Sequence, residues 1–255
     1  VLEILAEMRT RQVMAKTGNC CIAITACGRT KHWQNALGVL DQMPLMQAMP
    51  DVICHVAAMA ACEKGQAWQQ GLAVWAALRA RALAPDAGGY TCAISACAKG
   101  RRWQAAVHAL SEAQQRRVEL SVKSFNAAVT ACDGGRQWLR ALQLFSRMAR
   151  RVEPTAVSYG AGIRACATSG RWASALGMIS RMQEQLVEAD VICCNSAASA
   201  CEKGGQWIMA LNTLLSVRRC SLRAQAISYN AAISACEKAK RWRHATGLVS
   251  AMCQE

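Results

Sequence analysis

The sequence has few prolines and no apolar run long enough to cross a membrane. Proline interrupts helices because it lacks an amide hydrogen and its ring clashes with the preceding turn. Three of the four prolines, Pro50, Pro85 and Pro154, directly precede segments with helical periodicity, whereas Pro44 lies near the end of one. We therefore expect a chain of helices without membrane spans, in which Pro44 cuts one helix short.

Residue sets typical of catalysis are also missing. No paired carboxylates, no Ser-His-Asp set, no glycine-rich phosphate loop before a helix and no acidic cluster for a catalytic metal occur at any one place. The histidines stand at unrelated points, namely His32, His55, His108 and His244. The sequence predicts a protein that is not an enzyme and has neither a metal site nor a cofactor.

Cysteine, in contrast, is abundant, with 15 in the chain. Seven cysteines recur at one spacing, about one structural repeat apart, which is too far for a disulfide. The other eight form no C-x-x-C pair and have no histidine at zinc-ligand spacing. We expect reduced, unpaired thiols in an intracellular protein.

The dominant feature is an internal repeat of 35 residues, with a single step of 34. The repeated cysteines are Cys27, Cys62, Cys97, Cys132, Cys166, Cys201 and Cys236. A tryptophan keeps the same interval, as Trp33, Trp68, Trp103, Trp138, Trp172, Trp207 and Trp242. Self-similarity at a fixed interval of this length is typical of helical repeat arrays.

One repeat, from Phe125 to Met148, shows what each unit contains. An apolar face of a first helix is formed by Phe125, Ala128, Val129 and Cys132, and one of a second helix by Trp138, Ala141, Leu142 and Phe145. Gly134 and Gly135 separate the two helices, and the opposite face of the first helix carries Asn126, Thr130 and Asp133. Such hairpins bury their apolar faces only by stacking on neighbours. We predict an all-α fold, a right-handed α-solenoid of helix-turn-helix repeats.

We predict a single array over residues 1–255. The expected units are the end of a truncated repeat at 1–16, complete repeats at 17–51, 52–86, 87–121, 122–155, 156–190 and 191–225, and a truncated repeat at 226–255. Since the chain starts at Val1 and both ends fall within a repeat, we expect a segment of a longer array. A targeting peptide, or a catalytic domain, would then lie outside the segment.

The charge balance indicates an acidic partner. Thirty lysines and arginines stand against 16 aspartates and glutamates, which leaves a net charge of +14. The basic residues are spread over all repeats, as in Lys99 to Arg102 and Lys238 to Arg243. A basic stripe along a solenoid suits a polyanion laid lengthwise. The alternative is a solvated basic surface that serves solubility.

The repeat resembles the pentatricopeptide repeat family, in its P-type form. The likeness lies in the 35-residue interval, openings such as Ile227-Ser228-Tyr229-Asn230, an Ala-Cys-x-Lys ending of the first helix, an Ala-Leu pair in the second, and endings such as Pro85-Asp86. Tetratricopeptide repeats, in contrast, place their tryptophan in the first helix. The resemblance implies binding of single-stranded RNA, one base per repeat. It further implies a monomer in a mitochondrion or chloroplast that acts in transcript processing, stabilisation, editing or translation, with RNA-processing proteins as partners.

In the family, a base is read by the residue after the opening aromatic and by the last residue of the repeat. The first set is Cys21, Val56, Thr91, Asn126, Gly160, Asn195 and Asn230, and the second is Asp51, Asp86, Ser121, Thr155, Asp190 and Gln225. An ionised aspartate only accepts hydrogen bonds, so it favours the imino N–H of uracil or guanine. In the family, Asn goes with pyrimidines and Thr with purines. Cys21, Val56 and Gly160 cannot make the family's hydrogen bond, so base selection should be weaker there.

Two further roles follow from the resemblance. Phosphate contacts are assigned to Lys64, Lys99, Lys203 and Lys238, and base-wedging contacts to Ile53, Val157, Ile192 and Ile227. Arg29, Gly134 and Thr168 replace the lysine in the other repeats.

Three alternatives stay open. The tryptophans could stack on bases, but their place on an apolar stripe favours core packing. The asparagines at 126, 195 and 230 could be helix caps instead of reading residues. Finally, the array could be a scaffold that binds an acidic protein or peptide, in which case the residues after the opening aromatic have no special status.

Overall fold

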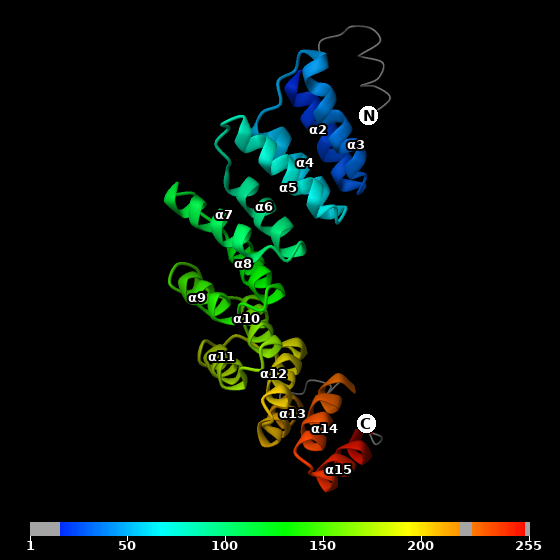
Figure 1. Ribbon diagram of the computed structural model, residues 1–255, viewed down its shortest axis with the longest axis vertical. Helices are drawn as coiled ribbons and strands as arrows, with labels where there is room; N and C mark the ends of the chain where they lie inside the picture. The colour runs from blue at the N-terminus through cyan, green and yellow to red at the C-terminus, as the bar shows by residue number, and fades with distance from the viewer. Residues whose placement is uncertain (1–15, 220–225, 253–255) are drawn as a thin grey trace. The chain divides into compact units, whose positions relative to one another are not determined.

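The computed structural model describes residues 16–219 and 226–252 (Figure 1). Within these residues the structure contains fourteen α-helices, one 3-10 helix and no strand, which confirms the all-α prediction. The truncated repeat predicted at 1–16 lies, apart from its last residue, outside the described part.

The helices alternate between two series. The first helices are α2 (Thr17–Arg29), α4 (Val52–Lys64), α6 (Ala87–Lys99), α8 (Val122–Gly134), α10 (Ala156–Thr168), α12 (Val191–Lys203) and α14 (Ala226–Lys238). The second helices are α3 (Trp33–Gln42), α5 (Trp68–Ala80), α7 (Trp103–Gln115), α9 (Trp138–Ala149), α11 (Trp172–Glu184), α13 (Trp207–Arg219) and α15 (Trp242–Met252). Each second helix begins at a tryptophan of the repeated series. As expected for Pro44, α3 is shorter than the others and is followed by the 3-10 helix η1 (Met43–Met46).

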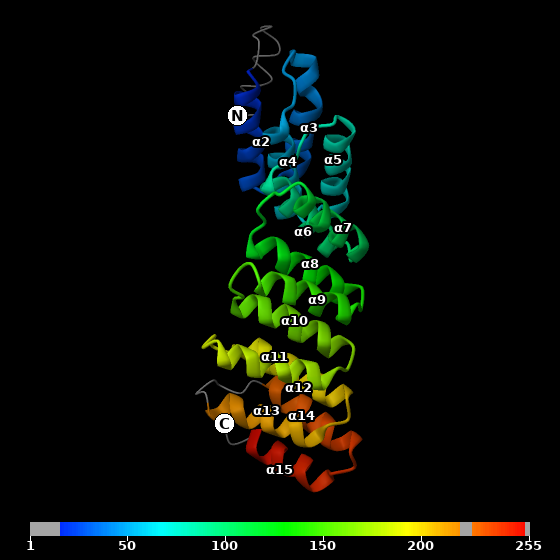
Figure 2. The ribbon, with the colours of Figure 1, turned by 90° about the vertical axis from the view of Figure 1, so that its left-hand side faces the viewer.

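The chain forms two compact units, residues 1–131 and 132–255, and each is built in the same way. In the first unit α2 packs on α4 and α4 packs on α6. The second helix α3 packs on α4, and α5 packs on α6. In the second unit α10, α12 and α14 follow one another in the same manner, and α9, α11 and α13 each pack on the next first helix. Figures 1 and 2 show this order of helices. Stacking of consecutive hairpins is the α-solenoid arrangement.

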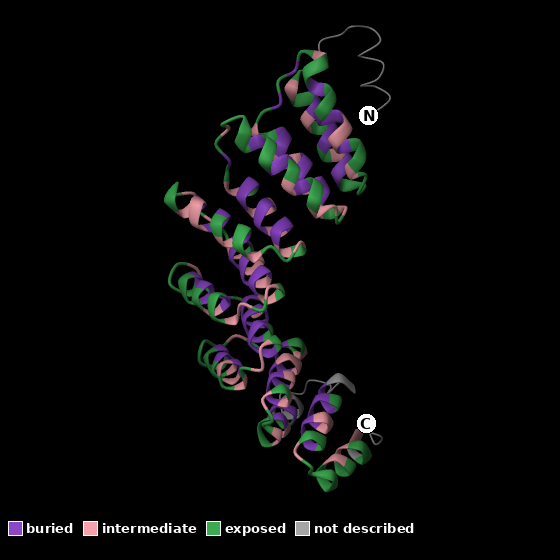
Figure 3. Ribbon diagram, viewed as in Figure 1, coloured by how far each residue is buried: buried purple, intermediate pink, exposed green. Residues whose placement is uncertain are grey.

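Buried residues concentrate on the first helices (Figure 3). The repeated cysteine is buried in all seven repeats, beside buried alanines such as Ala131 and Ala200. Small side chains at these positions let neighbouring first helices approach closely: a Cβ added at Gly28 would lie 3.2 Å from the Cβ of Ala61.

The turn inside each hairpin contains one residue in the left-handed region. These residues are Lys31, Gln66, Arg101, Arg136, Gly170, Gly205 and Lys240. The next residue donates its N–H to the carbonyl of the repeated cysteine, as in Gln137 N to Cys132 O at 2.8 Å. This geometry closes the helix end as in a Schellman motif. The break in the fourth repeat therefore does not depend on Gly134 and Gly135: α8 runs to Gly134, and the left-handed residue is Arg136, with a φ of 55°.

Candidate nucleic-acid interface

The predicted reading residues lie in the second turn of each first helix. Asn126 is the fifth residue of α8, Asn195 of α12 and Asn230 of α14. An N-cap residue precedes the helix and has non-helical backbone angles, so the interpretation of these asparagines as helix caps is wrong. Most side chains of the series are half buried; Asn230 is exposed and Gly160 is buried. A Cβ at Gly160 would lie 3.3 Å from the Sγ of Cys193, so this position offers no side chain and little room for one.

Four of the repeat-final residues are N-caps of first helices, and the hydroxyl of Ser121 lies 3.4 Å from that of Ser124. Asp51, Asp86 and Asp190 each precede a first helix, and their Oδ1 atoms accept the N–H of the third helical residue at 2.8, 2.7 and 2.7 Å. Thr155 forms a capping box with Ser158. Sequence reasoning assigned these residues to base reading alone, although Asp, Ser or Thr directly before a helical segment is a recognised start signal. The Gln225 assignment lies outside the described residues.

Capping uses only part of each carboxylate. The backbone N–H is bound by the Oδ1 atom in Asp51, Asp86 and Asp190, and all three residues are exposed. Burial alone would raise the pKa of Asp51, but hydrogen bonding to Cys54 outweighs it, so the pKa lies below its ordinary value. An ionised oxygen that accepts hydrogen bonds is therefore available beside the second turn of the helix.

Some reading residues also contact the following repeat. The hydroxyl of Thr91 lies 2.7 Å from the carbonyl of Ala87 and 2.7 Å from the hydroxyl of Ser124. The Oδ1 of Asn195 accepts a hydrogen bond from Ser228 at 2.5 Å. The Oδ1 of Asn126, in contrast, is buried without a hydrogen-bond partner in the described part of the chain. Buried polar atoms are usually hydrogen-bonded, so Asn126 has unused capacity.

Large apolar side chains project from the same helices into solvent. Ile53, Val157 and Ile192, which the resemblance assigns to wedging between bases, are 63%, 69% and 64% exposed. Each is the second residue of its helix, one turn before the reading residue and on the same side of the helix. The side chain of Ile227 lies outside the described residues. Exposed aliphatic residues at one repeated position, beside polar ones, suit a ligand with flat apolar faces.

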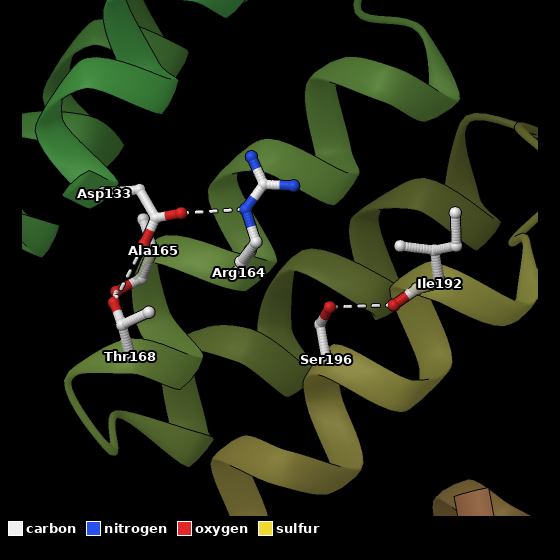
Figure 4. A network of polar contacts seen from close by, with 6 residues as sticks. All are labelled: Asp133, Arg164, Ala165, Thr168, Ile192 and Ser196. Carbon is white, nitrogen blue, oxygen red and sulfur yellow. Dashed lines mark hydrogen bonds and ion pairs between the residues drawn. The ribbon is translucent and has the colours of Figure 1, made fainter. Parts of the chain in front are cut away.

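The lysines assigned to phosphate contacts fall into two groups. Lys99 donates a hydrogen bond to the carbonyl of Glu63, and Lys238 forms an ion pair with Glu202 at 2.8 Å. Lys64 and Lys203 are exposed and make no ion pair or hydrogen bond within the described residues. In the fifth repeat Thr168 takes the lysine's place and, with Arg164, contacts Asp133 (Figure 4).

The tryptophans lie at the joints between repeats. Those of the first six repeats are half buried, and Trp242 is 66% exposed. A Cβ added at Gly65, Gly100 or Gly204 would come within 2.3, 2.6 and 2.3 Å of the tryptophan of the preceding repeat. Arginines of the next repeat cover Trp68, Trp138 and Trp207. The expectation of packing therefore holds in a modified form: the indole packs between repeats and is not fully buried.

Other classes of site find no support in the described residues. No group of three or more His, Cys, Asp or Glu side chains there is arranged to hold a metal ion. None of the helices there has the length and apolar character needed to cross a bilayer.

The comparisons with known proteins agree with this geometry. The family model described as PPR repeat matches residues 157–185 and 227–255. No curated protein matches the chain. The structure of the pentatricopeptide repeat protein PPR10 in complex with an 18-nt psaJ RNA element matches 99% of this chain, with a TM-score of 0.58 and 16% sequence identity. The chain spans 42% of that protein.

A second solved structure is the PPR domain of Arabidopsis thaliana protein-only RNase P 1 in complex with tRNA. It matches 62% of this chain and 83% of its own length, with a TM-score of 0.54 and 16% identity. At such identities the likeness shows the fold, while the repeat model identifies the sequence of the hairpins. Residues 157–185 and 227–255 thus have the sequence of pentatricopeptide repeats, and the described helices have the fold of solved pentatricopeptide repeat arrays.

Proposed function

We propose that this chain binds single-stranded RNA with base preference, one nucleotide per repeat, along its first helices. The observation that carries the proposal is the recurrence of one arrangement: a reading residue in the second turn, an exposed carboxylate or hydroxyl at the cap, and in several repeats an exposed aliphatic residue between them. Bases offer hydrogen-bonding edges and apolar faces, and this arrangement addresses both.

The charge supports a polyanionic ligand. The net charge is +14, and exposed cations such as Lys64 and Lys203 stand at the ends of the helices that carry the reading residues. The RNA complexes of PPR10 and protein-only RNase P 1 support the choice of RNA. Like the reading roles, the cellular role is part of the proposal. The chain acts as a binding protein, not as a catalyst, in the processing, stabilisation, editing or translation of a transcript in a mitochondrion or chloroplast.

The test is a competition experiment. A labelled random-sequence single-stranded RNA is bound to the purified chain and challenged with unlabelled single-stranded RNA, duplex RNA, duplex DNA or polyglutamate. Because bases are accessible only in the single strand, we expect that RNA alone to compete efficiently. Equal competition by duplex DNA would indicate a non-selective basic surface, and efficient competition by polyglutamate would favour a scaffold for acidic proteins.

A further inference from the structure

Successive first helices are joined by hydrogen bonds that recur at every second junction. Glu63, Asp133 and Glu202 follow the repeated cysteine of the second, fourth and sixth repeats. Each accepts hydrogen bonds from two residues of the next first helix. We call this arrangement the acidic clasp.

The three clasps use corresponding positions. Glu63 accepts from Ser95 at 2.7 Å on its carboxylate and from Lys99 on its carbonyl. Glu202 accepts from Ser234 and Lys238, both at 2.8 Å. Asp133 accepts from Arg164 at 2.8 Å and from Thr168 at 3.0 Å, as Figure 4 shows.

The same junctions carry an arginine over a tryptophan. Arg102 lies 5.9 Å from the ring centre of Trp68, Arg171 lies 4.8 Å from that of Trp138, and Arg241 lies 5.4 Å from that of Trp207. The even repeats have Ala67, Gln137 and Gln206 where these arginines stand. Clasp and arginine therefore recur together, every second repeat.

The alternation decides which lysines are available. A lysine at the end of a first helix reaches back to the acidic residue of the preceding repeat. The first and fifth repeats have Gly28 and Ala167 in place of that acid, so Lys64 and Lys203 have no acidic partner in the repeat before them. Lys99 and Lys238, in contrast, are held by Glu63 and Glu202.

A held lysine is a weaker ligand for phosphate. Lys99 and Lys238 each donate a hydrogen bond to the acidic residue of the clasp, and the charge of Lys238 is balanced by the carboxylate of Glu202. Burial would raise the pKa of Glu202, but hydrogen bonds from Lys238 and Ser234 outweigh it and lower that pKa, so the carboxylate stays charged at neutral pH. The ammonium groups of Lys64 and Lys203 each have three donors that make no hydrogen bond within the described residues, so these donors can bind a phosphate.

We propose that Lys64 and Lys203 are the lysines of this series that bind the RNA backbone, whereas Lys99 and Lys238 are positioning residues that join neighbouring repeats. The proposal rests on the proposed function and refines it: backbone contacts by these lysines occur at selected repeats and not once in each.

The experiment compares four single variants of the whole chain, Lys64→Ala, Lys203→Ala, Lys99→Ala and Lys238→Ala. Each removes one positive charge, so the effect of net charge is matched among them. Binding to a single-stranded RNA is measured at several salt concentrations, and the slope of log affinity against log salt is compared. Each phosphate contact on a single strand contributes about 0.7 to that slope. We expect K64A and K203A each to lower the slope by about 0.7, and K99A and K238A to leave it unchanged.

A second measurement, thermal unfolding, tests the ion pair between Lys238 and Glu202. K238A and Glu202→Gln should each lower the thermal midpoint of unfolding. The double variant should be no less stable than the less stable of the two single variants, because both changes break the same interaction. K203A should leave the midpoint unchanged. Equal slope losses in all four lysine variants, or none in K64A and K203A, would overturn the proposal. If the unaltered chain does not bind RNA at all, the proposed function fails with it, so the two failures are distinguishable.

Discussion

The guanidinium carbon of Arg171 lies 4.8 Å from the centre of the Trp138 ring, so a cation of the fifth repeat covers an indole of the fourth. Trp138 begins α9 and is half buried, and Arg171 is the residue before α11. The contact shows that the repeated tryptophan belongs to the joint between repeats. Its role is therefore to hold neighbours together, and its indole face is not presented to a base.

Trp138→Ala should destabilise the chain by about 2 kcal/mol or more, since truncating a large buried aromatic costs about 3–5 kcal/mol and this one is half buried. Arg171→Ala should cost only about 0.5–1 kcal/mol, as expected for an exposed cation–π contact. Trp242→Ala is the matched control: Trp242 is 66% exposed, and its replacement should change stability little. Urea unfolding followed by circular dichroism measures all three. An unchanged midpoint for Trp138→Ala together with lost RNA binding would make the indole a stacking platform.

Asp190→Ala should destabilise α12 by about 1 kcal/mol, because the carboxylate accepts the N–H of Cys193 at 2.7 Å and caps the helix. Asp190→Asn should retain most of that stability, since asparagine is an equally good cap. Although Asp190→Asn keeps the stability, it should change RNA recognition. An amide can donate as well as accept hydrogen bonds, so the preference for guanine or uracil at the fifth base should become weaker. Glu188→Ala removes a nearby exposed charge that caps nothing. Parallel losses of stability and base preference in Asp190→Asn would contradict two separable roles for this side chain.

The fold followed from the sequence because its determinants are local and repeated. The positions of Cys132 and Trp138 in one repeat, copied along the chain, predict where first helices lie and where second helices begin. Contacts between side chains of different repeats could not be predicted in this way. Asp133 meets Arg164 and Thr168 only because successive first helices pack at a particular offset, which hydrophobic periodicity does not specify. The cap role of Asp190 could have been predicted from its place before a helix; it was missed because the family resemblance supplied a different role.

The repeated cysteines should be slow to react with a thiol reagent in the native chain. Burial raises the pKa of Cys62, Cys97, Cys132, Cys166 and Cys201 to about 11, so few are thiolates near pH 8. Cys21 is half buried and should react earlier. Titration with a chromogenic disulfide, with and without denaturant, measures the two classes. Fast reaction of all cysteines in the absence of denaturant would show that the first helices are not packed as described.

The same thiols link stability to alkaline pH. An unfolded thiol loses its proton near pH 9, while these folded thiols keep theirs to about pH 11. Their contribution is therefore complete below pH 9 and is lost as the pH rises towards 11, because only the unfolded chain gains from ionisation in that range. Urea midpoints between pH 8 and 11 should fall. Cys132→Ala should lower the urea midpoint at pH 8 but reduce its decrease between pH 8 and 11. An identical decrease in the variant and the unaltered chain would show that Cys132 does not contribute to the pH dependence.

Asn126→Thr should change the base preferred by the fourth complete repeat and little else. Asn126 lies in the second turn of α8. Its Oδ1 atom has no hydrogen-bond partner within the described residues, so replacing the asparagine breaks no hydrogen bond to Oδ1. A threonine there should direct its hydroxyl to the carbonyl four residues earlier, as Thr91 does to Ala87 at 2.7 Å. The apolar face formed by Phe125, Val129 and Cys132 stays intact, so the urea midpoint should move little.

If one repeat reads one base, RNA selected from a random pool should shift from pyrimidine to purine at the fourth position alone. The former base should lose about 1–3 kcal/mol of binding, the range for a good base contact in DNA recognition. Ala127→Thr is the matched control, since it adds the same side chain beside Asn126 and leaves the reading residue in place. An unchanged preference in Asn126→Thr, or a change spread over several positions, would show that the second turn of the first helix does not read single bases in this chain, and the basic surface would then bind RNA without regard to sequence.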